Sequence, residues 1–253
     1  MAEPVYRPVI FTAKTLFRAL GVRFTVTGQE HMPTTGGAIL AINHNSYLDY
    51  AFAGLPADRA GHRVVRFMAK EGIFRNPVAG PAMRAMGHIS VDRDAGSEAF
   101  RQGVRALRDG ELLGVFPEGT MSRSFELLPF KSGAVRMAAM AQVPIIPMVV
   151  FGGQLILSYD HRSFARGHDV LLTVGEPITV EKRADAHAET DRLRTLMAAM
   201  LDETIARFPR PAGSDLWWLP ERLGGSAPTP EEARRMRSRP SRDDNDEPGT
   251  APA

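Results

Sequence analysis

The chain of 253 residues contains no cysteine. It can therefore form neither a disulfide nor a thiolate nucleophile, and this excludes a covalent intermediate on a thiol. The absence of cysteine also fits a reducing compartment. A Gly-x-Ser-x-Gly sequence, which would indicate a serine nucleophile, is missing too. The sequence therefore indicates neither a thiol nor a serine intermediate.

Long apolar runs are also scarce. Residues 137–159 carry no charge and meet the length of a membrane-spanning helix. Pro144, Pro147, Gly152 and Gly153 interrupt this run, so we expect a helix end, a buried strand and a loop instead. The N-terminus lacks the basic start and the long apolar segment of a signal peptide.

The first 23 residues form a candidate interfacial helix. Large apolar residues alternate there with Lys14 and Arg18. The segment before residue 30 contains four basic residues and only one acidic residue. Such a helix can lie on an anionic lipid surface. The alternative is a helix that packs on the domain with its apolar side. We expect the interfacial helix at 1–23.

The remainder divides into a domain at 24–220 and a tail at 221–253. Short strand patterns alternate with helix patterns, which predicts an α/β domain with a mixed central β-sheet flanked by helices. Trp217 and Trp218 are expected to pack on this domain rather than at a membrane interface. The tail is rich in Pro, Ser, Arg and acids, and we predict that it is disordered.

His44 and Asp49 follow a predicted strand at 38–42. On a continuous helix, five steps of about 100° would place them about 140° apart. They can touch only if His44 lies in a loop and Asp49 in the first turn of the next helix, which we expect to begin at Ser46 or Tyr47. Alternatively, Ser46-x-x-Asp49 is a capping box, and Asp49 serves only the helix N-terminus.

Three further blocks follow in the chain. They are the Gly-x5-Arg element 87–93, the Phe-Pro-Glu-Gly-Thr-Met-Ser segment 116–122 and the Val-Pro-Ile-Ile-Pro segment 143–147. Each is a weak signal alone. With these four blocks, in this order, the chain resembles the 1-acylglycerol-3-phosphate acyltransferases, within the glycerolipid acyltransferases, over roughly residues 24–205. Segments 67–71 and 131–134 resemble further segments of that family.

This resemblance implies the glycerolipid acyltransferase fold and acyl transfer to the sn-2 hydroxyl of 1-acyl-sn-glycerol 3-phosphate, giving phosphatidic acid. The donor would be the thioester of acyl-CoA or of acyl carrier protein, and no cofactor is implied. His44 would act as general base, because an imidazole accepts a proton near neutral pH. Asp49 would orient the imidazole and stabilise its charged form.

The resemblance also implies the substrate contacts. Residues 59–93 include seven basic and two acidic residues, a net +5 against +2 for the whole chain. Most of these charges fit a solvated or lipid-attracted face. The family's motifs assign the acceptor's phosphate to Lys70 and Arg93, the glycerol to Glu118 and Gly119, further substrate contacts to Thr120 and Lys131, and the acyl-donor side to Pro144, Ile145 and Pro147. A backbone N–H near 118–120 would stabilise the oxyanion.

One residue departs from the family's pattern. Met121 stands where the family usually has an arginine, and Met cannot replace Arg in a bidentate phosphate contact. Either Arg123 makes that contact or the anionic group is held differently. The acceptor therefore stays open, and glycerol 3-phosphate or another lysophospholipid is the alternative.

Two other classes of function fit the sequence less well. A membrane-binding protein without catalysis would not need His44, Asp49 and Glu118 together. A nucleic-acid-binding protein would show a recognised motif, and none is present. The seven histidines form no metal-ligand pattern, and nothing indicates an oligomeric state. We expect as partners lysophosphatidic acid, the thioester and an anionic membrane surface, with peripheral attachment at the cytoplasmic face of the membrane.

Overall fold

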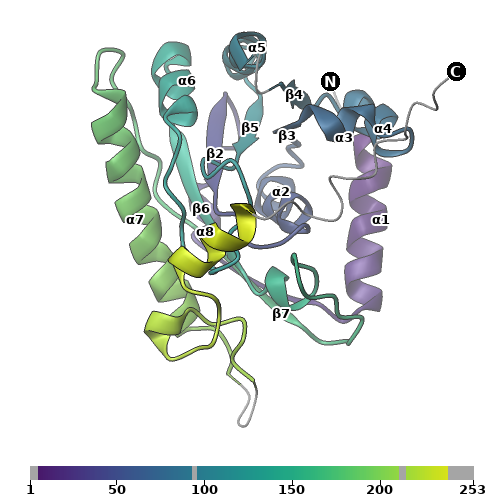
Figure 1. Ribbon diagram of the computed structural model, residues 1–253. Coiled ribbons are helices and arrows are strands. Elements are labelled where there is room, and N and C mark those ends of the chain that lie inside the picture. The colour runs from purple at the N-terminus through teal and green to yellow at the C-terminus, as the bar shows by residue number, and fades with distance from the viewer. Residues whose placement is uncertain (1–4, 93–95, 211–214, 239–253) are drawn as a thin grey trace, which may run out of the picture.

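The computed structural model describes residues 5–92, 96–210 and 215–238. Its centre is a seven-stranded sheet in the order β1-β7-β6-β2-β5-β3-β4 (Figure 1). All neighbouring strands are parallel except β6 and β7. The predicted mixed sheet with flanking helices is confirmed. The strands are β1 (Arg23–Thr27), β2 (Ala38–Ile42), β3 (Val65–Lys70), β4 (Ile89–Val91), β5 (Leu112–Val115), β6 (Ile145–Phe151) and β7 (Asp169–Val174).

Helices cover both faces of the sheet (Figure 1). The α-helices are α1 (Tyr6–Ala19), α2 (Asp49–Arg59), α3 (Glu71–Arg75), α4 (Ala79–Ala85), α5 (Gly96–Arg108), α6 (Gly133–Ala141), α7 (Ala186–Ala206) and α8 (Pro230–Ser238). Short 3₁₀ helices are η1 (Gln29–His31), η2 (Gly153–Leu155) and η3 (Glu221–Leu223). The uncharged run 137–159 comprises the end of α6, the buried strand β6 and a loop, as predicted. None of the described helices is long and apolar enough to cross a bilayer.

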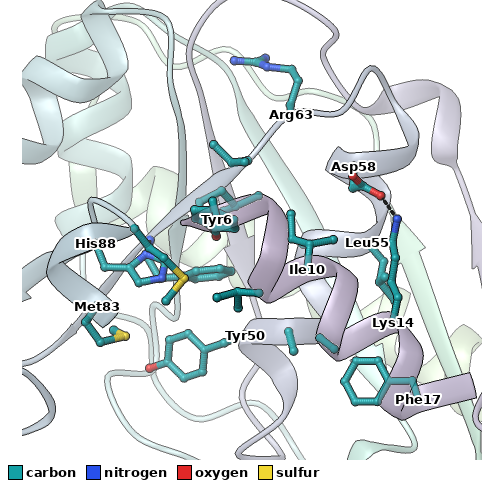
Figure 2. A pocket seen from close by; sticks show the side chains of 18 of the residues that line it. Tyr6, Ile10, Lys14, Phe17, Tyr50, Leu55, Asp58, Arg63, Met83 and His88 are labelled. Atoms are coloured by element: carbon teal, nitrogen blue, oxygen red, sulfur yellow. Dashed lines mark hydrogen bonds and ion pairs between the residues drawn. The ribbon is translucent and has the colours of Figure 1, made fainter. Parts of the chain in front are cut away.

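Helix α1 packs on the domain and also keeps an apolar outer face. Tyr6 and Phe17 are buried on the side shown in Figure 2: Tyr6 donates its hydroxyl to Val65 O of β3, and the Phe17 ring contacts that of Phe52 in α2. Phe11 and Leu16 are 72% and 54% exposed. The helix is therefore held by one face, and its other face is free for a further contact.

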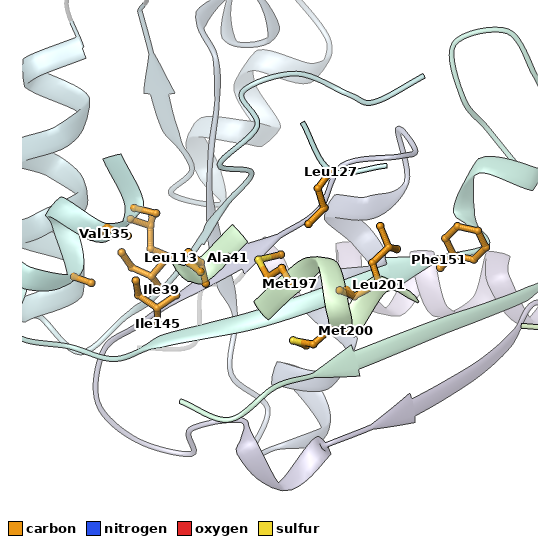
Figure 3. Packing of buried hydrophobic residues seen from close by; sticks show 14 of the residues in the cluster. Ile39, Ala41, Leu113, Leu127, Val135, Ile145, Phe151, Met197, Met200 and Leu201 are labelled. Carbon is orange, nitrogen blue, oxygen red and sulfur yellow. The ribbon is translucent and has the colours of Figure 1, made fainter. Parts of the chain in front are cut away.

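Two apolar clusters lie on opposite faces of β2, because successive side chains of a strand alternate between faces. Ile39 and Ala41 belong to the cluster under α5, α6 and α7, where they meet Leu113 and Met197 (Figure 3). Ala38, Leu40 and Ile42 belong to the cluster under α1 and α2. Strand β2 is thus a fully buried central strand.

Parallel pairing of β2, β5 and β3 places three loops at one edge of the sheet. Ala41 pairs with Val115, and Phe67 pairs with Gly114, so the three strands end close together. The chain leaving β2 carries His44, the chain leaving β5 carries segment 116–122, and β3 ends at Lys70. Ligands of α/β proteins bind at such carboxyl edges.

The predicted disorder from residue 221 is wrong as far as Ser238. A reciprocal capping box starts α8: Glu232 N–H donates to Thr229 Oγ1, and Thr229 N–H donates to Glu232 Oε2. Arg222 also bridges Glu126 and Asp202. These contacts order a polar segment that has few large apolar residues. Residues 239–253 lie outside the described part of the chain.

The tryptophan pair packs on the domain, as predicted. Trp218 is buried and its ring contacts those of Phe151 and Phe208. Trp217 lies against Phe125 and His161. The segment before η3 is therefore fixed to the loop that follows β5.

Candidate active site

The expected contact between His44 and Asp49 is confirmed. His44 Nδ1 lies 3.0 Å from Asp49 Oδ2, with His44 in the loop after β2 and Asp49 at the first residue of α2. The helix begins at Asp49, so the expected start at Ser46 or Tyr47 is wrong. Ser46 N–H donates to Asp49 Oδ2 over 2.7 Å, and Ser46 Oγ accepts from Leu48 N–H. Asp49 therefore orients His44 and also closes the turn before the helix.

The Asp49 carboxyl group is almost completely buried. Burial raises its pKa, whereas the hydrogen bonds from His44, Ser46 and Asn45 act in the opposite direction. Its place at the positive end of α2 also favours the carboxylate. With Asp49 accepting from Nδ1–H, the other ring nitrogen, Nε2, is left to accept a proton.

Aromatic rings hold the imidazole from two sides. Phe116 stacks on it with 4.3 Å between ring centres, and Tyr50 meets it edge-on at 5.6 Å. Tyr50 also packs against Phe116 and Phe67. The plane of the His44 ring is therefore fixed by packing as well as by Asp49.

Glu118 lies behind the histidine loop. Its Oε1 accepts the N–H of His44 over 2.9 Å, and its Oε2 accepts the N–H of Leu128 over 2.8 Å. The residue is 5% exposed, and burial raises its pKa to about 8. The predicted contact with glycerol is therefore corrected: both oxygens bind backbone, so Glu118 positions the His44 loop. Ser122 N–H, which donates to His44 O, ties the same two loops together.

His44 opens onto a cavity of about 530 Å³, which we call the His44 cavity. Four of the predicted substrate-binding residues line it: Lys70, Gly119, Thr120 and Lys131. Gly119 has φ of 69°, and a Cβ there would lie 3.0 Å from the end of the Lys131 side chain. Glycine at this position thus leaves room for the lysine.

The lining of the His44 cavity includes an apolar part, which we call its apolar end. Met68 from β3, Phe100 from α5 and Met137 from α6 line it, as does Met121. One cavity therefore combines a base, two cations and apolar walls.

Arg123 is placed outside the cavity lining. Its guanidinium pairs with Asp160 and lies over the Tyr159 ring, 4.1 Å from the ring centre. Tyr159, not Arg123, lines the His44 cavity. Arg93 falls outside the described residues.

The residues predicted on the acyl-donor side do not line the cavity either. Ile145 and Pro147 are buried in β6, between β2 and β7, and Pro144 directly precedes that strand. A central strand covered on both faces has no side chain left for a substrate. This prediction is corrected: Ile145 and Pro147 are buried in the sheet, and Pro144 is a partly buried residue outside the cavity lining.

A second cavity, of about 370 Å³, lies beneath α1 and was not predicted. We call it the α1 cavity. Its lining is mostly apolar and comes from α1, α2, β3, α3, α4 and the loops between them, with the ion pair Lys14–Asp58 at one side and His88 at another (Figure 2). Tyr47, Tyr50 and Ile73 line both cavities. The two spaces therefore share a wall next to His44.

In the described ranges no three His, Asp or Glu side chains come together as a metal-ligand set. A buried carboxylate, an oriented imidazole and an anion-attracting cavity suit proton removal from a hydroxyl.

Comparison with known proteins agrees with this geometry. A family model described as Acyltransferase matches residues 23–151. The 1-acyl-sn-glycerol-3-phosphate acyltransferase of Bacillus subtilis (strain 168) is 29% identical over 202 residues, which is 77% of this chain and 94% of that protein. The 1-acyl-sn-glycerol-3-phosphate acyltransferase alpha of Mus musculus is 32% identical over 205 residues, 79% of this chain and 70% of that protein.

A solved structure shares the fold. It is the crystal structure of the 1-acyl-sn-glycerophosphate (LPA) acyltransferase PlsC from Thermotoga maritima, which superimposes with a TM-score of 0.67 over 81% of each chain, at 23% sequence identity.

Proposed function

The chain belongs to the acyltransferase family, and from this premise we propose that it acylates the sn-2 hydroxyl of 1-acyl-sn-glycerol 3-phosphate to give phosphatidic acid. The donor is a fatty acyl thioester of coenzyme A or of acyl carrier protein. The observation that carries the proposal is the His44–Asp49 pair on a cavity that also holds Lys70 and Lys131.

In the proposed reaction His44 Nε2 removes the proton from the sn-2 hydroxyl as its oxygen attacks the thioester carbonyl. The tetrahedral intermediate then collapses, the C–S bond breaks, and the imidazolium returns its proton to the leaving thiolate. Asp49 keeps the proton on Nδ1 and stabilises the imidazolium between these steps. The substrate supplies the nucleophile, so the chain needs none of its own.

The oxyanion requires backbone N–H donors near His44. The Gly119 N–H donates to Phe116 O over 3.0 Å, so it is already used. Thr120 and Met121 line the cavity, and no described residue accepts from their N–H groups. We assign the oxyanion to these two donors.

The acceptor's phosphate is assigned to Lys70 and Lys131. Both line the His44 cavity, next to the amino-terminal end of α6 at Ser132 and Gly133, where helix polarity favours an anion. Met121 offers an apolar side chain to this cavity and Arg123 is engaged by Asp160, so neither is needed for the phosphate.

The α1 cavity favours a lysophospholipid over glycerol 3-phosphate as acceptor. It adjoins His44 through Tyr50, and an acceptor without a chain would leave this apolar space unused. The apolar end of the His44 cavity, at Met68, Phe100 and Met137, is the proposed place for the donor's chain.

We also propose that the protein docks on the cytoplasmic face of the membrane through α1. Phe11 and Leu16 project from its outer face, and Arg7 and Arg18 lie on the same helix. Apolar side chains flanked by cations suit an anionic interface.

The reaction is tested with the purified full chain, 1-acyl-sn-glycerol 3-phosphate and either thioester. We expect phosphatidic acid from the wild type and none above background from His44→Ala. His187→Ala, at an exposed histidine in the first turn of α7, is the control and keeps full activity. An active His44→Ala variant would remove the general base from the proposal.

A further inference from the structure

The α1 cavity has a polar group at its boundary with the site of reaction. Tyr50 contacts the His44 ring with one edge and lines both cavities. Its hydroxyl end points away from α1, toward the side where Met83 lies (Figure 2). No described residue accepts a hydrogen bond from it. Burial raises the pKa of Tyr50 to about 12, so it remains a phenol with a proton to donate.

The shape of the proposed acceptor matches this arrangement. Its existing chain is attached through an ester at sn-1, on the carbon next to the one that bears the sn-2 hydroxyl. When that hydroxyl is at His44, the ester is one carbon away, and the chain beyond it must leave the site in some direction. Tyr50, whose ring centre is 5.6 Å from that of His44, stands at the entrance to the α1 cavity.

Resting on the proposed function, we propose that the α1 cavity receives the acyl chain already carried by the acceptor. Tyr50 is then a specificity-determining residue, whose hydroxyl donates a hydrogen bond to the carbonyl of the sn-1 ester.

The position of the cavity favours the acceptor's chain over the donor's chain. A lysophospholipid resides in the bilayer, and the α1 cavity lies directly under the helix that carries the exposed Phe11 and Leu16. A thioester carried by coenzyme A or a carrier protein arrives from water. The His44 cavity, with its own apolar end, offers the donor's chain a separate place. Each chain thus has one cavity.

The hydrogen bond is tested with Tyr50→Phe and two acceptors, 1-acyl-sn-glycerol 3-phosphate and its 1-O-alkyl ether analogue, which lacks the carbonyl. We expect kcat/KM for the ester to fall about twofold to tenfold, as for the loss of one neutral hydrogen bond, with the ether unaffected. Tyr6→Phe is the matched control, because Tyr6 lines the same cavity but donates its hydroxyl to Val65 O. An unchanged ester-to-ether ratio in Tyr50→Phe would overturn the role of Tyr50.

The occupant of the cavity is tested with Gly54→Met. Gly54 lies on α2 in the cavity wall, and a Cβ built there meets no atom within 4 Å, so a side chain at this position has room to start and is expected to extend into the cavity. We expect long sn-1 chains to be disfavoured relative to short ones, by about fourfold for each excluded methylene. The preference for donor chain length stays the same.

Gly72→Met is the control for this experiment. It alters a helical glycine that also has open space but lines neither cavity. A shift in donor chain length without a shift in acceptor chain length would assign the cavity to the donor and overturn the inference. A wild type that acylates neither acceptor would refute the proposed function itself, which separates the two failures.

Discussion

Glu118 and Asp49 are two buried carboxyl groups that use their oxygens in different ways. One oxygen of Asp49, Oδ2, accepts hydrogen bonds from the His44 ring and from the turn before α2, so Asp49 acts on the imidazole directly. Glu118 accepts two backbone N–H groups, from His44 and Leu128, and thereby fixes where the histidine loop stands. The first residue sets the state of the base and the second sets its position.

Glu118 gives a prediction for stability against pH. Burial raises its pKa from 4.5 to about 8, so between these values the native state holds a proton that the unfolded chain releases. The free energy of unfolding therefore falls as pH rises through this window, by at most about 1.4 kcal/mol per pH unit from this group. Denaturant titrations from pH 5 to 8 should show a shallower fall for Glu118→Gln than for the wild type.

The difference between the two proteins isolates Glu118, because they share the other titrating groups. These include His88, whose pKa burial lowers to about 4. Identical slopes for wild type and Glu118→Gln would show that Glu118 stays ionised throughout.

At this scale the sequence predicted contacts between side chains better than contacts with backbone. The five-residue spacing of His44 and Asp49 allowed one meeting geometry, and it occurs. The family resemblance assigned Glu118 to the substrate, and its motif gives no information on the hydrogen-bond partners of the side chain. Those partners are N–H groups 74 and 10 residues away, and no residue type marks them.

Helix α1 shows how one element can serve two surfaces. Its buried face, with Tyr6 and Phe17, closes the α1 cavity, while Phe11 is 72% exposed on the outer face. The packed and the interfacial alternatives raised by its sequence are therefore compatible. An amphipathic pattern identifies an apolar and a polar face. It does not say whether packing on the domain buries all the apolar residues of the helix or leaves some exposed.

The outer face is tested with Phe11→Glu in a sedimentation assay with vesicles that contain anionic lipid. We expect membrane partitioning to drop about tenfold or more, because burying a Phe side chain contributes roughly 1.5–3 kcal/mol. Met140→Gln, at an apolar residue of α6 that is 49% exposed, should bind as the wild type does. Equal binding of all three proteins would contradict docking through α1.

Helix α8 was not predicted, because the polar composition of the segment indicated disorder and a local helix-capping pattern was not considered. The segment from 221 is polar and rich in Pro and Ser, which indicates disorder. Thr229-x-x-Glu232 is nevertheless a capping-box pattern, and the structure uses it. Ala233 is buried against the domain, so the helix is held by a small contact that periodicity could not predict.

On the scale of the whole molecule, distant elements support the loop after β5. Arg194 of α7 donates to Leu127 O and Leu128 O, both over 3.1 Å, and Leu128 N–H binds Glu118. Trp217 packs on Phe125 from the other side. The chain's C-terminal third thus braces the loop that positions His44.

Arg194→Ala should therefore affect both stability and catalysis. Two hydrogen bonds from a charged group are lost, so we expect the free energy of unfolding to fall by about 2 kcal/mol. We expect kcat to fall too, because Glu118 and His44 lose their support. Arg192→Ala, at a 66% exposed neighbour on the same helix, is the control for both measurements. A destabilised Arg194→Ala variant with normal kcat would show that the contacts of Arg194 support the fold but do not help to position His44.

The α1 cavity could not be predicted from the sequence. Alternating strand and helix patterns predicted the fold class, and two of the four motifs, His44–Asp49 and 116–122, lie in loops that meet. The α1 cavity is lined by α1, α2, β3, α3, α4 and intervening loops, with residues from Tyr6 to His88. These residues come from separate segments, and only their assembly leaves a space. No local pattern encodes such a void.

The wall shared by the two cavities bears on how a product could leave. A diacyl product formed at His44 would have one acyl chain in each cavity, with the Tyr50 ring between the two chains. Neither tail can cross to the other cavity while Tyr47, Tyr50 and Ile73 stay in place. Release of both tails then requires these side chains to move or the two tails to leave together, so we expect product release to contribute to the rate of turnover.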